Sequence, residues 1–310
     1  MTAPRVGKPS LWRFDPKSGK TENWALDRDV GALALRRKGG AVLALDDGFY
    51  FFDFGSGRLD TIALVDADQP RTRLNDGRCD RRGRFFAGGM DDKEELKICG
   101  LWRLDPELRV AKVDQGIICS NGPCWSPDDR TFYFADTFQG EMWAYDYDIE
   151  AGTLANKRLF ASFEKDSGVA DGSTVDAEGC VWNAQLISGD LVRYAPDGSV
   201  ERRIGMPVRN ITSVMFGGEK LDEIYGQENQ SRPFSRAPPL EAAWRRFWAS
   251  EVRACGHFAC EIGQGATPVA PNFPAQLGTT HLQGARPATS EPQVSRGATR
   301  CRARGDTSGG

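Results

Sequence analysis

Residues 74–89 read Leu-Asn-Asp-Gly-Arg-Cys-Asp-Arg-Arg-Gly-Arg-Phe-Phe-Ala-Gly-Gly, and this plan recurs along the chain. An Asx-Gly pair precedes a short alternating apolar piece, a polar turn and a compact apolar strand. The same order begins at Asn121-Gly122 and Asp171-Gly172, and weaker copies begin at Gly31 and Ser213. The copies start at positions 31, 76, 121, 171 and 213, which are 45, 45, 50 and 42 residues apart. A period in this range with strand-like contents is typical of the blades of a β-propeller.

A second hairpin follows each of the first four copies, so that one repeat supplies about four short strands. These hairpins lie at 49–59, 101–110, 142–159 and 191–204. Residues 11–26 predict one more hairpin, which has no inner strands of its own before it. Helical periodicity is weak before residue 230, and the gaps are too short for the helices of a parallel α/β fold. We therefore predict an all-β fold, a six-bladed β-propeller of four-stranded blades that is incomplete at both ends.

The composition changes in the last part of the chain. Residues 228–310 contain no Lys, one Asp and ten Arg, and the repeat does not recur there. We expect residues 1–227 to form the propeller and residues 228–310 to be an aberrant or disordered tail, with one short helix near 239–252. The abrupt change also supports the hypothesis that the sequence after about residue 226 is an out-of-frame translation.

Charge and composition narrow the class of partner. The net charge of −3 gives no bulk electrostatic case for nucleic acid. The first residues lack the apolar core of a signal peptide, and no run approaches the roughly 20 apolar residues of a membrane span. We expect a cytoplasmic protein without a nucleic-acid or membrane partner.

The eight cysteines form no Cys-x-x-Cys pair, so buried reduced thiols are expected and zinc or redox motifs are not.

Equivalent positions of successive blades surround one central channel, so distant residues can converge there. Four of the five register positions carry a side-chain oxygen. The five are Gly31, Asp76, Asn121, Asp171 and Ser213. Carboxylate and amide oxygens suit hard cations, and three Asx residues in register therefore indicate a shared cation site. The alternative is local turn chemistry, because Asn-Gly and Asp-Gly are also common turn pairs.

The repeats leave few options for catalysis. Both histidines, His257 and His281, lie beyond them, which excludes a Ser-His-Asp or Cys-His mechanism in the repeat region. Arg73 and Asn75 are two residues apart on the strand that leads to Asp76. Side chains at this spacing face the same side of a strand, where both can bind substrate oxygens. Carboxylates, amides, Arg and a bound metal are thus the available chemistry.

Three blocks of the sequence begin with Arg73-Leu-Asn-Asp-Gly77, Ser120-Asn-Gly122 and Asp171-Gly172, and continue with Gly83–Gly88, Trp125–Asp129, Phe132–Asp136 and Val175–Gly179. Together they resemble the senescence marker protein (regucalcin), gluconolactonase and luciferin-regenerating enzyme family. The resemblance covers residues 11 to about 225. It implies a six-bladed propeller, one divalent cation (Ca²⁺, Mg²⁺, Mn²⁺ or Zn²⁺) and hydrolysis of a sugar lactone to the aldonic acid.

The resemblance also implies roles for single residues. Asn121 and Asp171 match metal ligands, and Asp171 matches the general base that activates water. Arg73 and Asn75 match substrate-binding residues. Asp76 is in register with these residues and is kept as a further candidate ligand.

One family ligand has no counterpart in this chain. The family's third protein ligand is a Glu in a Gly-Glu-x-Pro-x-Trp motif near the N-terminus, whereas residues 6–12 place Lys8 where that carboxylate is needed. We therefore expect an impaired cation site, and the activity of this chain is left open. The alternative function is a non-catalytic propeller that acts as a calcium- or ligand-binding or interaction scaffold. The sequence does not identify the lactone, the metal or the oligomeric state.

Overall fold

The computed structural model describes residues 9–15, 18, 20–163, 168–217, 221–228 and 243–248. Throughout this part the regular structure is β-strand, arranged in six antiparallel sheets. Four of these sheets have four strands, one has three and one has two. The all-β prediction is confirmed, and a count of six blades for the whole chain remains a prediction.

The two-stranded sheet pairs β1 (Ser10–Asp15) with β2 (Lys20–Ala25). Each four-stranded sheet consists of consecutive hairpins. The first contains β3 (Val30–Leu35), β4 (Ala41–Leu45), β5 (Gly48–Phe52) and β6 (Leu59–Leu64), and the second contains β7 (Thr72–Cys79), β8 (Phe85–Asp91), β9 (Cys99–Leu104) and β10 (Val110–Ile117). The third contains β11 (Ser120–Trp125), β12 (Thr131–Asp136), β13 (Glu141–Asp148) and β14 (Thr153–Ser162), and the fourth contains β15 (Val169–Val175), β16 (Val181–Leu186), β17 (Asp190–Tyr194) and β18 (Val200–Gly205). The three-stranded sheet contains β19 (Ile211–Gly217), β20 (Glu223–Glu228) and β21 (Ala243–Trp248).

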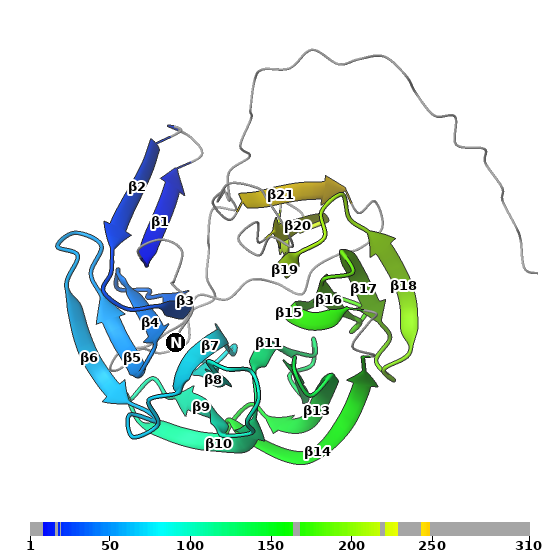
Figure 1. The fold of residues 1–310 in the computed structure, drawn as a ribbon, viewed down its shortest axis with the longest axis horizontal. Helices are drawn as coiled ribbons and strands as arrows, with labels where there is room; N and C mark the ends of the chain where they lie inside the picture. Colours follow the sequence, from blue (N-terminus) through cyan, green and yellow to red (C-terminus); the bar gives the residue numbers. More distant parts are fainter. Residues whose placement is uncertain are drawn as a thin grey trace, which may run out of the picture. The chain divides into compact units, whose positions relative to one another are not determined.

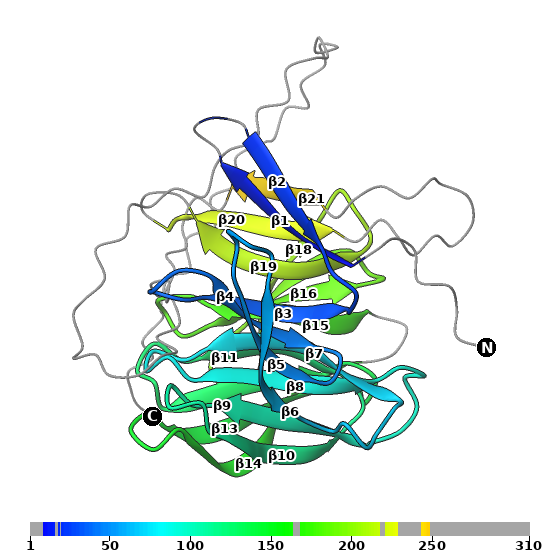
Figure 2. The same cartoon turned by 90° about the vertical axis from the view of Figure 1, so that its left-hand side faces the viewer.

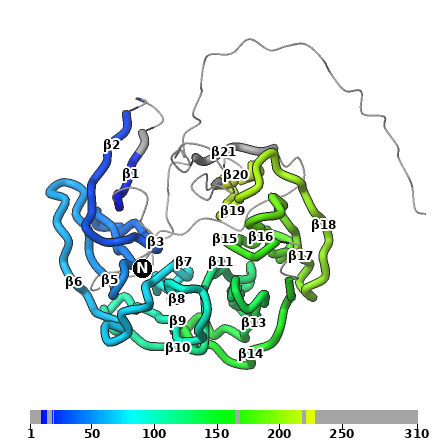
Figure 3. The backbone as a smooth tube through the Cα atoms, in the orientation of Figure 1, coloured from blue at the N-terminus to red at the C-terminus, as the bar shows by residue number. Residues whose placement is uncertain are grey.

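Within the unit Met1–Thr279, the sheets follow one another in chain order around a centre (Figure 1). The tube in Figure 3 traces the same path. The first strand of each larger sheet lies nearest the centre, where β3, β7, β11, β15 and β19 contact one another in sequence. The β1–β2 hairpin and the β19–β21 sheet lie on the same side of the ring in Figures 1 and 2. This arrangement of antiparallel sheets is that of a β-propeller.

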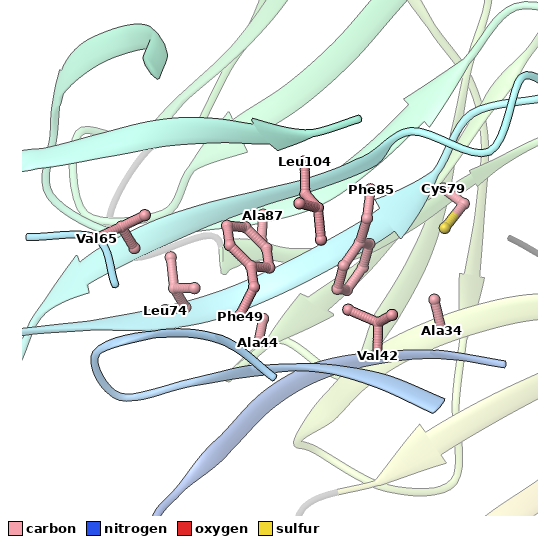
Figure 4. Close-up of a cluster of buried hydrophobic side chains, with 10 residues drawn as sticks. All are labelled: Ala34, Val42, Ala44, Phe49, Val65, Leu74, Cys79, Phe85, Ala87 and Leu104. Carbon is pink, nitrogen blue, oxygen red and sulfur yellow. The ribbon is translucent and has the colours of Figure 1, made fainter. Parts of the chain in front are cut away.

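Apolar side chains fill the space between neighbouring sheets. Figure 4 shows the cluster between β3–β6 and β7–β10, in which Phe49 and Phe85 meet edge to face with ring centroids 5.8 Å apart. Both rings are fully buried. Burying a side chain of this size is worth about 1.5–3 kcal/mol. Because alternate residues of a strand face opposite neighbours, each sheet is held mainly by the two sheets beside it.

A β-bulge recurs near the start of the first strand of each larger sheet. Bulges add a residue to one strand and re-aim the side chains beside it. Here they coincide with the register positions that the repeat predicts. The pairing shifts between Val30 and Ala32, Leu74 and Asp76, Asn121 and Cys124, Ala170 and Ser173, and Ile211 and Ser213.

The two ends of the described chain bear on further predictions. The expected hairpin at residues 11–26 is present as β1 and β2, and it pairs with no other described strand. The helix expected near 239–252 is wrong for Ala243–Trp248, because these six residues form β21 and pair with β20. The rest of the predicted tail lies outside the described residues, so the boundary after residue 227 stays a prediction.

The described part of the chain shows the state of five cysteines and contains no candidate membrane-spanning helix. Four cysteines, Cys99, Cys119, Cys124 and Cys180, are free and buried as expected. The expectation of reduced thiols is wrong for Cys79, which is disulfide-bonded. Among the residues that the structure describes, no helix is long and apolar enough to cross a membrane.

Candidate functional site

A cavity of about 520 Å³ opens where the inner strands begin, at the centre of the ring. The convergence predicted from the repeat spacing is confirmed, because all five register residues line this one cavity. Arg73 and Asn75 line it as well. The remaining lining residues are Val30, Met90, Glu94, Cys119, Thr137, Phe138, Leu186, Asn210, Thr212 and Gln227.

The Asx-Gly pairs at 76, 121 and 171 lie inside β7, β11 and β15. The alternative reading of these pairs as turns is therefore wrong. Their glycines permit close approach between neighbouring sheets. A Cβ on Gly122, which has a φ of 59°, would lie 2.8 Å from the backbone nitrogen of Ser173. The repeat thus requires Gly so that neighbouring inner strands can pack tightly behind the Asx side chains.

Asn121 is buried and held from two sides. Its Nδ2 donates to Thr137 Oγ1 at 2.7 Å and to Cys119 Sγ at 3.6 Å. Its Oδ1 accepts a hydrogen bond of 3.0 Å from Asn75 Nδ2. A carbonyl oxygen has two lone pairs, so Oδ1 keeps one for a further partner in the cavity.

The two predicted substrate-binding residues differ in what they can offer. Asn75 Nδ2 donates to Ser120 O and to Asn121 Oδ1, both at 3.0 Å. An amide nitrogen carries two hydrogens, so Asn75 has its Oδ1 left for a substrate hydroxyl. Arg73 donates to Leu74 O at 3.2 Å and lies 3.5 Å from Asp92 Oδ1. A guanidinium has five N–H groups, so Arg73 retains donors for substrate oxygens.

Asp76 ties two inner strands together. One carboxylate oxygen accepts from Gly77 N at 2.7 Å, and the other accepts from Gly122 N at 2.8 Å. Burial raises the pKa of Asp76 above its usual value. Asp76 therefore joins β7 to β11, and because each carboxylate oxygen keeps a second lone pair, it stays a further candidate ligand.

Asp171 lies within the bulge of β15, and its backbone is fixed from the neighbouring strand. Asn183, fully buried on β16, donates from Nδ2 to Asp171 O at 2.9 Å and to Ser173 Oγ at 3.0 Å. Burial and then the charge of Asp171 raise the pKa of the Cys119 thiol well above its usual range. The Cys119 thiol and Asp171 line the same cavity.

Ten of the lining residues were not singled out by sequence reasoning, and Thr137 and Glu94 are two of them. Thr137 follows β12, and its equivalents in neighbouring sheets, Met90 and Leu186, also reach the cavity. The end of each second strand could have been recognised as returning to the register end, because hairpin strands are antiparallel. Glu94 reaches the cavity from the loop after β8, with a φ of 62° that a sequence pattern does not reveal.

A second acidic cluster lies at the opposite end of β15. Oxygens of Asp176 and Glu178 and the sulfur of Cys180 lie within 4.8 Å of one another. Arg193 Nε donates to Asp176 Oδ2 at 2.8 Å, and the same guanidinium also pairs with Glu178. Burial raises the pKa of the Cys180 thiol. The Arg193 guanidinium thus balances the charge of both carboxylates without a metal ion.

The donors in the central cavity fit a hard divalent cation. Asn121 supplies an amide oxygen and Asp171 a carboxylate, which are the ligand types preferred by Ca²⁺, Mg²⁺ and Mn²⁺. No histidine lies among the described residues, and Cys119 is the single cysteine among the described lining residues, so the set of several Cys and His ligands that is typical of structural zinc is not present there. The fold and this cavity together define a propeller with a polar, oxygen-lined central site.

Comparison with known proteins identifies the family. Residues 6–226 match the SMP-30/Gluconolactonase/LRE-like region, and the chain belongs to this family. Regucalcin from Xenopus laevis is 34% identical over 219 residues, which cover 69% of this chain and 73% of the relative. A 6-deoxy-6-sulfogluconolactonase from Pseudomonas putida is 35% identical over 225 residues, which cover 71% of this chain and 77% of the relative.

Solved structures support the fold. A luciferin-regenerating enzyme superposes with a TM-score of 0.74 at 22% identity, covering 83% of this chain and 89% of that protein. A calcium-binding protein, regucalcin from Agrobacterium tumefaciens, also has a TM-score of 0.74, at 26% identity, covering 82% of this chain and 86% of that protein. The predicted family resemblance and the propeller are thus confirmed.

Proposed function

We propose that this protein is a divalent-metal-dependent lactonase, a carboxylic ester hydrolase that opens a sugar lactone to the aldonic acid. Family membership and the sulfogluconolactonase relative support the lactonase class. The observation that carries the proposal is the convergence of Asn121, Asp171, Arg73 and Asn75 on one cavity. A scaffold that only binds partners would not need these four residues together.

The proposed chemistry assigns each residue a task. Asp171 accepts a proton from the attacking water as general base. The water oxygen bonds to the lactone carbonyl carbon, the ring C–O bond breaks, and the ring oxygen leaves as a hydroxyl after taking up a proton. Arg73 donates hydrogen bonds to lactone oxygens, and Asn75 accepts one from a sugar hydroxyl through Oδ1. These contacts hold the carbonyl carbon against the water.

Asn121 and Asp171 would hold the divalent cation. When bound, it would polarise the lactone carbonyl and stabilise the negative charge that develops on its oxygen. Asp76 would keep the two inner strands in register, and it remains a further candidate ligand. Because the family's N-terminal Glu has no match in this sequence, we expect the cation to bind more weakly than in relatives that have it.

The test measures binding and turnover separately on the full chain. Calorimetric titration with Ca²⁺, Mg²⁺, Mn²⁺ and Zn²⁺ follows removal of metal with a chelator. Hydrolysis of gluconolactone and related sugar lactones is then followed by acid release, after subtraction of the uncatalysed rate. Cation binding together with cation-dependent hydrolysis is the expected result.

Two outcomes would overturn the proposal. Cation binding without hydrolysis of any sugar lactone would favour the scaffold alternative. The similarity to a solved regucalcin that is named as a calcium-binding protein supports this alternative. Hydrolysis that persists at full rate after chelation would remove the metal from the mechanism. The Asp171→Asn variant is the matched control, because it keeps the size of the side chain and removes its charge and basicity.

A further inference from the structure

Thr137 occupies a bridging position between the two proposed cation ligands. It follows β12 and is buried at the edge of the cavity. Its Oγ1 accepts a hydrogen bond of 2.7 Å from Asn121 Nδ2 and donates one of 2.7 Å to Ala170 O. Ala170 directly precedes Asp171. One hydroxyl therefore connects the side chain of Asn121 to the backbone that carries Asp171.

The polarity of this bridge is fixed by chemistry. A hydroxyl has one hydrogen, and the carbonyl of Ala170 can only accept it. The hydroxyl oxygen must then act as acceptor toward Asn121, so the amide group that faces Thr137 must be the NH₂. The carbonyl oxygen of Asn121 consequently points away from Thr137, toward Asn75 and the cavity. A flipped amide would place two acceptors against each other.

We propose that Thr137 is a positioning residue that holds the Asn121 oxygen toward the cation and couples it to the Asp171 strand. This inference rests on the proposed function for the identity of the ligand. An amide presents a cation with either an oxygen or a nitrogen whose hydrogens repel it, and the Thr137 hydroxyl selects the oxygen. Residues that orient ligands in this way change metal affinity by about 10- to 100-fold when they are removed.

The experiment compares three variants by Ca²⁺ titration calorimetry. Thr137→Val keeps the shape of the side chain but removes the hydroxyl, and we expect it to weaken Ca²⁺ binding by about 10- to 100-fold. Thr137→Ser restores the hydroxyl and should bind nearly as well as the unaltered chain. Thr174→Val, on β15 and outside the cavity lining, controls for the loss of a threonine hydroxyl elsewhere. Thermal unfolding of each variant shows whether it is folded.

A second measurement does not depend on the cation. In protein labelled with ¹⁵N-asparagine, the side-chain NH₂ signals of Asn121 are assigned by their loss in Asn121→Asp. Thr137→Val should shift these signals and speed their exchange with water, and Thr137→Ser should not.

The outcomes separate the inference from the proposed function. If the unaltered chain binds no divalent cation but the Asn121 signals respond to Thr137→Val, the proposed function fails and the positioning contact stands. If a folded Thr137→Val chain binds Ca²⁺ as tightly as the unaltered chain, or the Asn121 signals do not change, the inference is overturned.

Discussion

The two ends of β15 use aspartate in opposite ways. Asp176, at the turn end, is fully buried, and its Oδ2 accepts from Arg193 Nε at 2.8 Å and Trp182 Nε1 at 2.9 Å. Its Oδ1 accepts two backbone amides of the turn at 3.0 Å. Asp171, five positions earlier, lies in a bulge at the cavity end and lines the same cavity as Asn121 and Arg73. A carboxylate thus stabilises the fold where a buried arginine faces it, and is placed for ligand chemistry where the lining is mixed and polar.

The same contrast separates the ends of β7. Asp80, at its turn end, accepts from Arg82 N at 2.9 Å and Arg84 N at 2.8 Å, and pairs with the Arg84 guanidinium at 2.9 Å. Asp76, at the cavity end, receives two backbone amides and a raised pKa through burial. The turn ends therefore hold the ring together, and the cavity end holds the polar groups whose burial costs stability unless they are bonded.

The largest expected effect comes from Asp171→Ala. Loss of the general base and of the anionic ligand should remove detectable Ca²⁺ binding and lower the rate of lactone hydrolysis by about 10²- to 10⁴-fold. Calorimetry and acid-release kinetics on the same preparation measure both. Thermal unfolding should change little. Metal-dependent hydrolysis that survives in this variant would refute the role of Asp171.

The counterpart at the turn end is Asp176→Asn. Removing this charge leaves the buried Arg193 guanidinium with the carboxylates of Glu178 and Glu201, and the loss of the charged hydrogen bonds to Asp176 should lower the free energy of unfolding by about 1–3 kcal/mol. Urea denaturation followed by tryptophan fluorescence measures the loss. The fraction that remains folded should bind Ca²⁺ with unchanged affinity. A drop in affinity without a drop in stability would contradict the division between the two ends.

Gly122→Ala probes the packing behind the cavity. Its Cβ would lie 2.8 Å from Ser173 N, and the positive φ adds backbone strain, so we expect a loss of about 1–3 kcal/mol. Gly39→Ala is the matched control, because Gly39 also has a positive φ but a Cβ there meets nothing within 4 Å. Equal losses of unfolding free energy in the two variants would show that close approach of the strands contributes nothing.

The smallest expected effect is on the pH dependence of stability. It tests whether every carboxylate at the cavity end of a strand is available for ligands. Asp91 lies at the cavity end of β8, yet an ion pair with Arg71 holds its pKa below the usual value, and the amides of Leu96, Glu95 and Lys93 act in the same direction. A lowered folded-state pKa contributes stability above the unfolded pKa of about 4, and this contribution is lost as the pH falls below it.

Asp91→Asn should therefore lower the melting temperature at neutral pH by a few degrees and make the curve flatter in acid. Melting curves between about pH 3 and pH 7 compare it with the unaltered chain. If the melting temperature of the variant falls as steeply with decreasing pH as that of the unaltered chain, Asp91 does not contribute to the loss of stability in acid.

Much of the site could be predicted from the sequence, because residues at equivalent positions of successive propeller blades meet around one central axis. The register of Asp76, Asn121 and Asp171 predicted a common cavity, and alternation within one strand placed Arg73 and Asn75 there too. The same pattern could not show that the Asx-Gly pairs lie in bulged strands rather than turns. That choice depends on hydrogen bonds to the second strand and on the neighbouring sheet against which Gly122 packs.

The sequence by itself determined the all-β class, the order of the hairpins and the ring of register residues, because strand alternation and turn residues are local signals. Only the tertiary structure decided which polar atoms are already committed. Asn75 has both amide hydrogens bound, Asp76 has a backbone amide on each oxygen, and Thr137 sets the orientation of Asn121. These contacts join residues of different strands and sheets, and a hydrogen bond between them exists only once those elements are brought together.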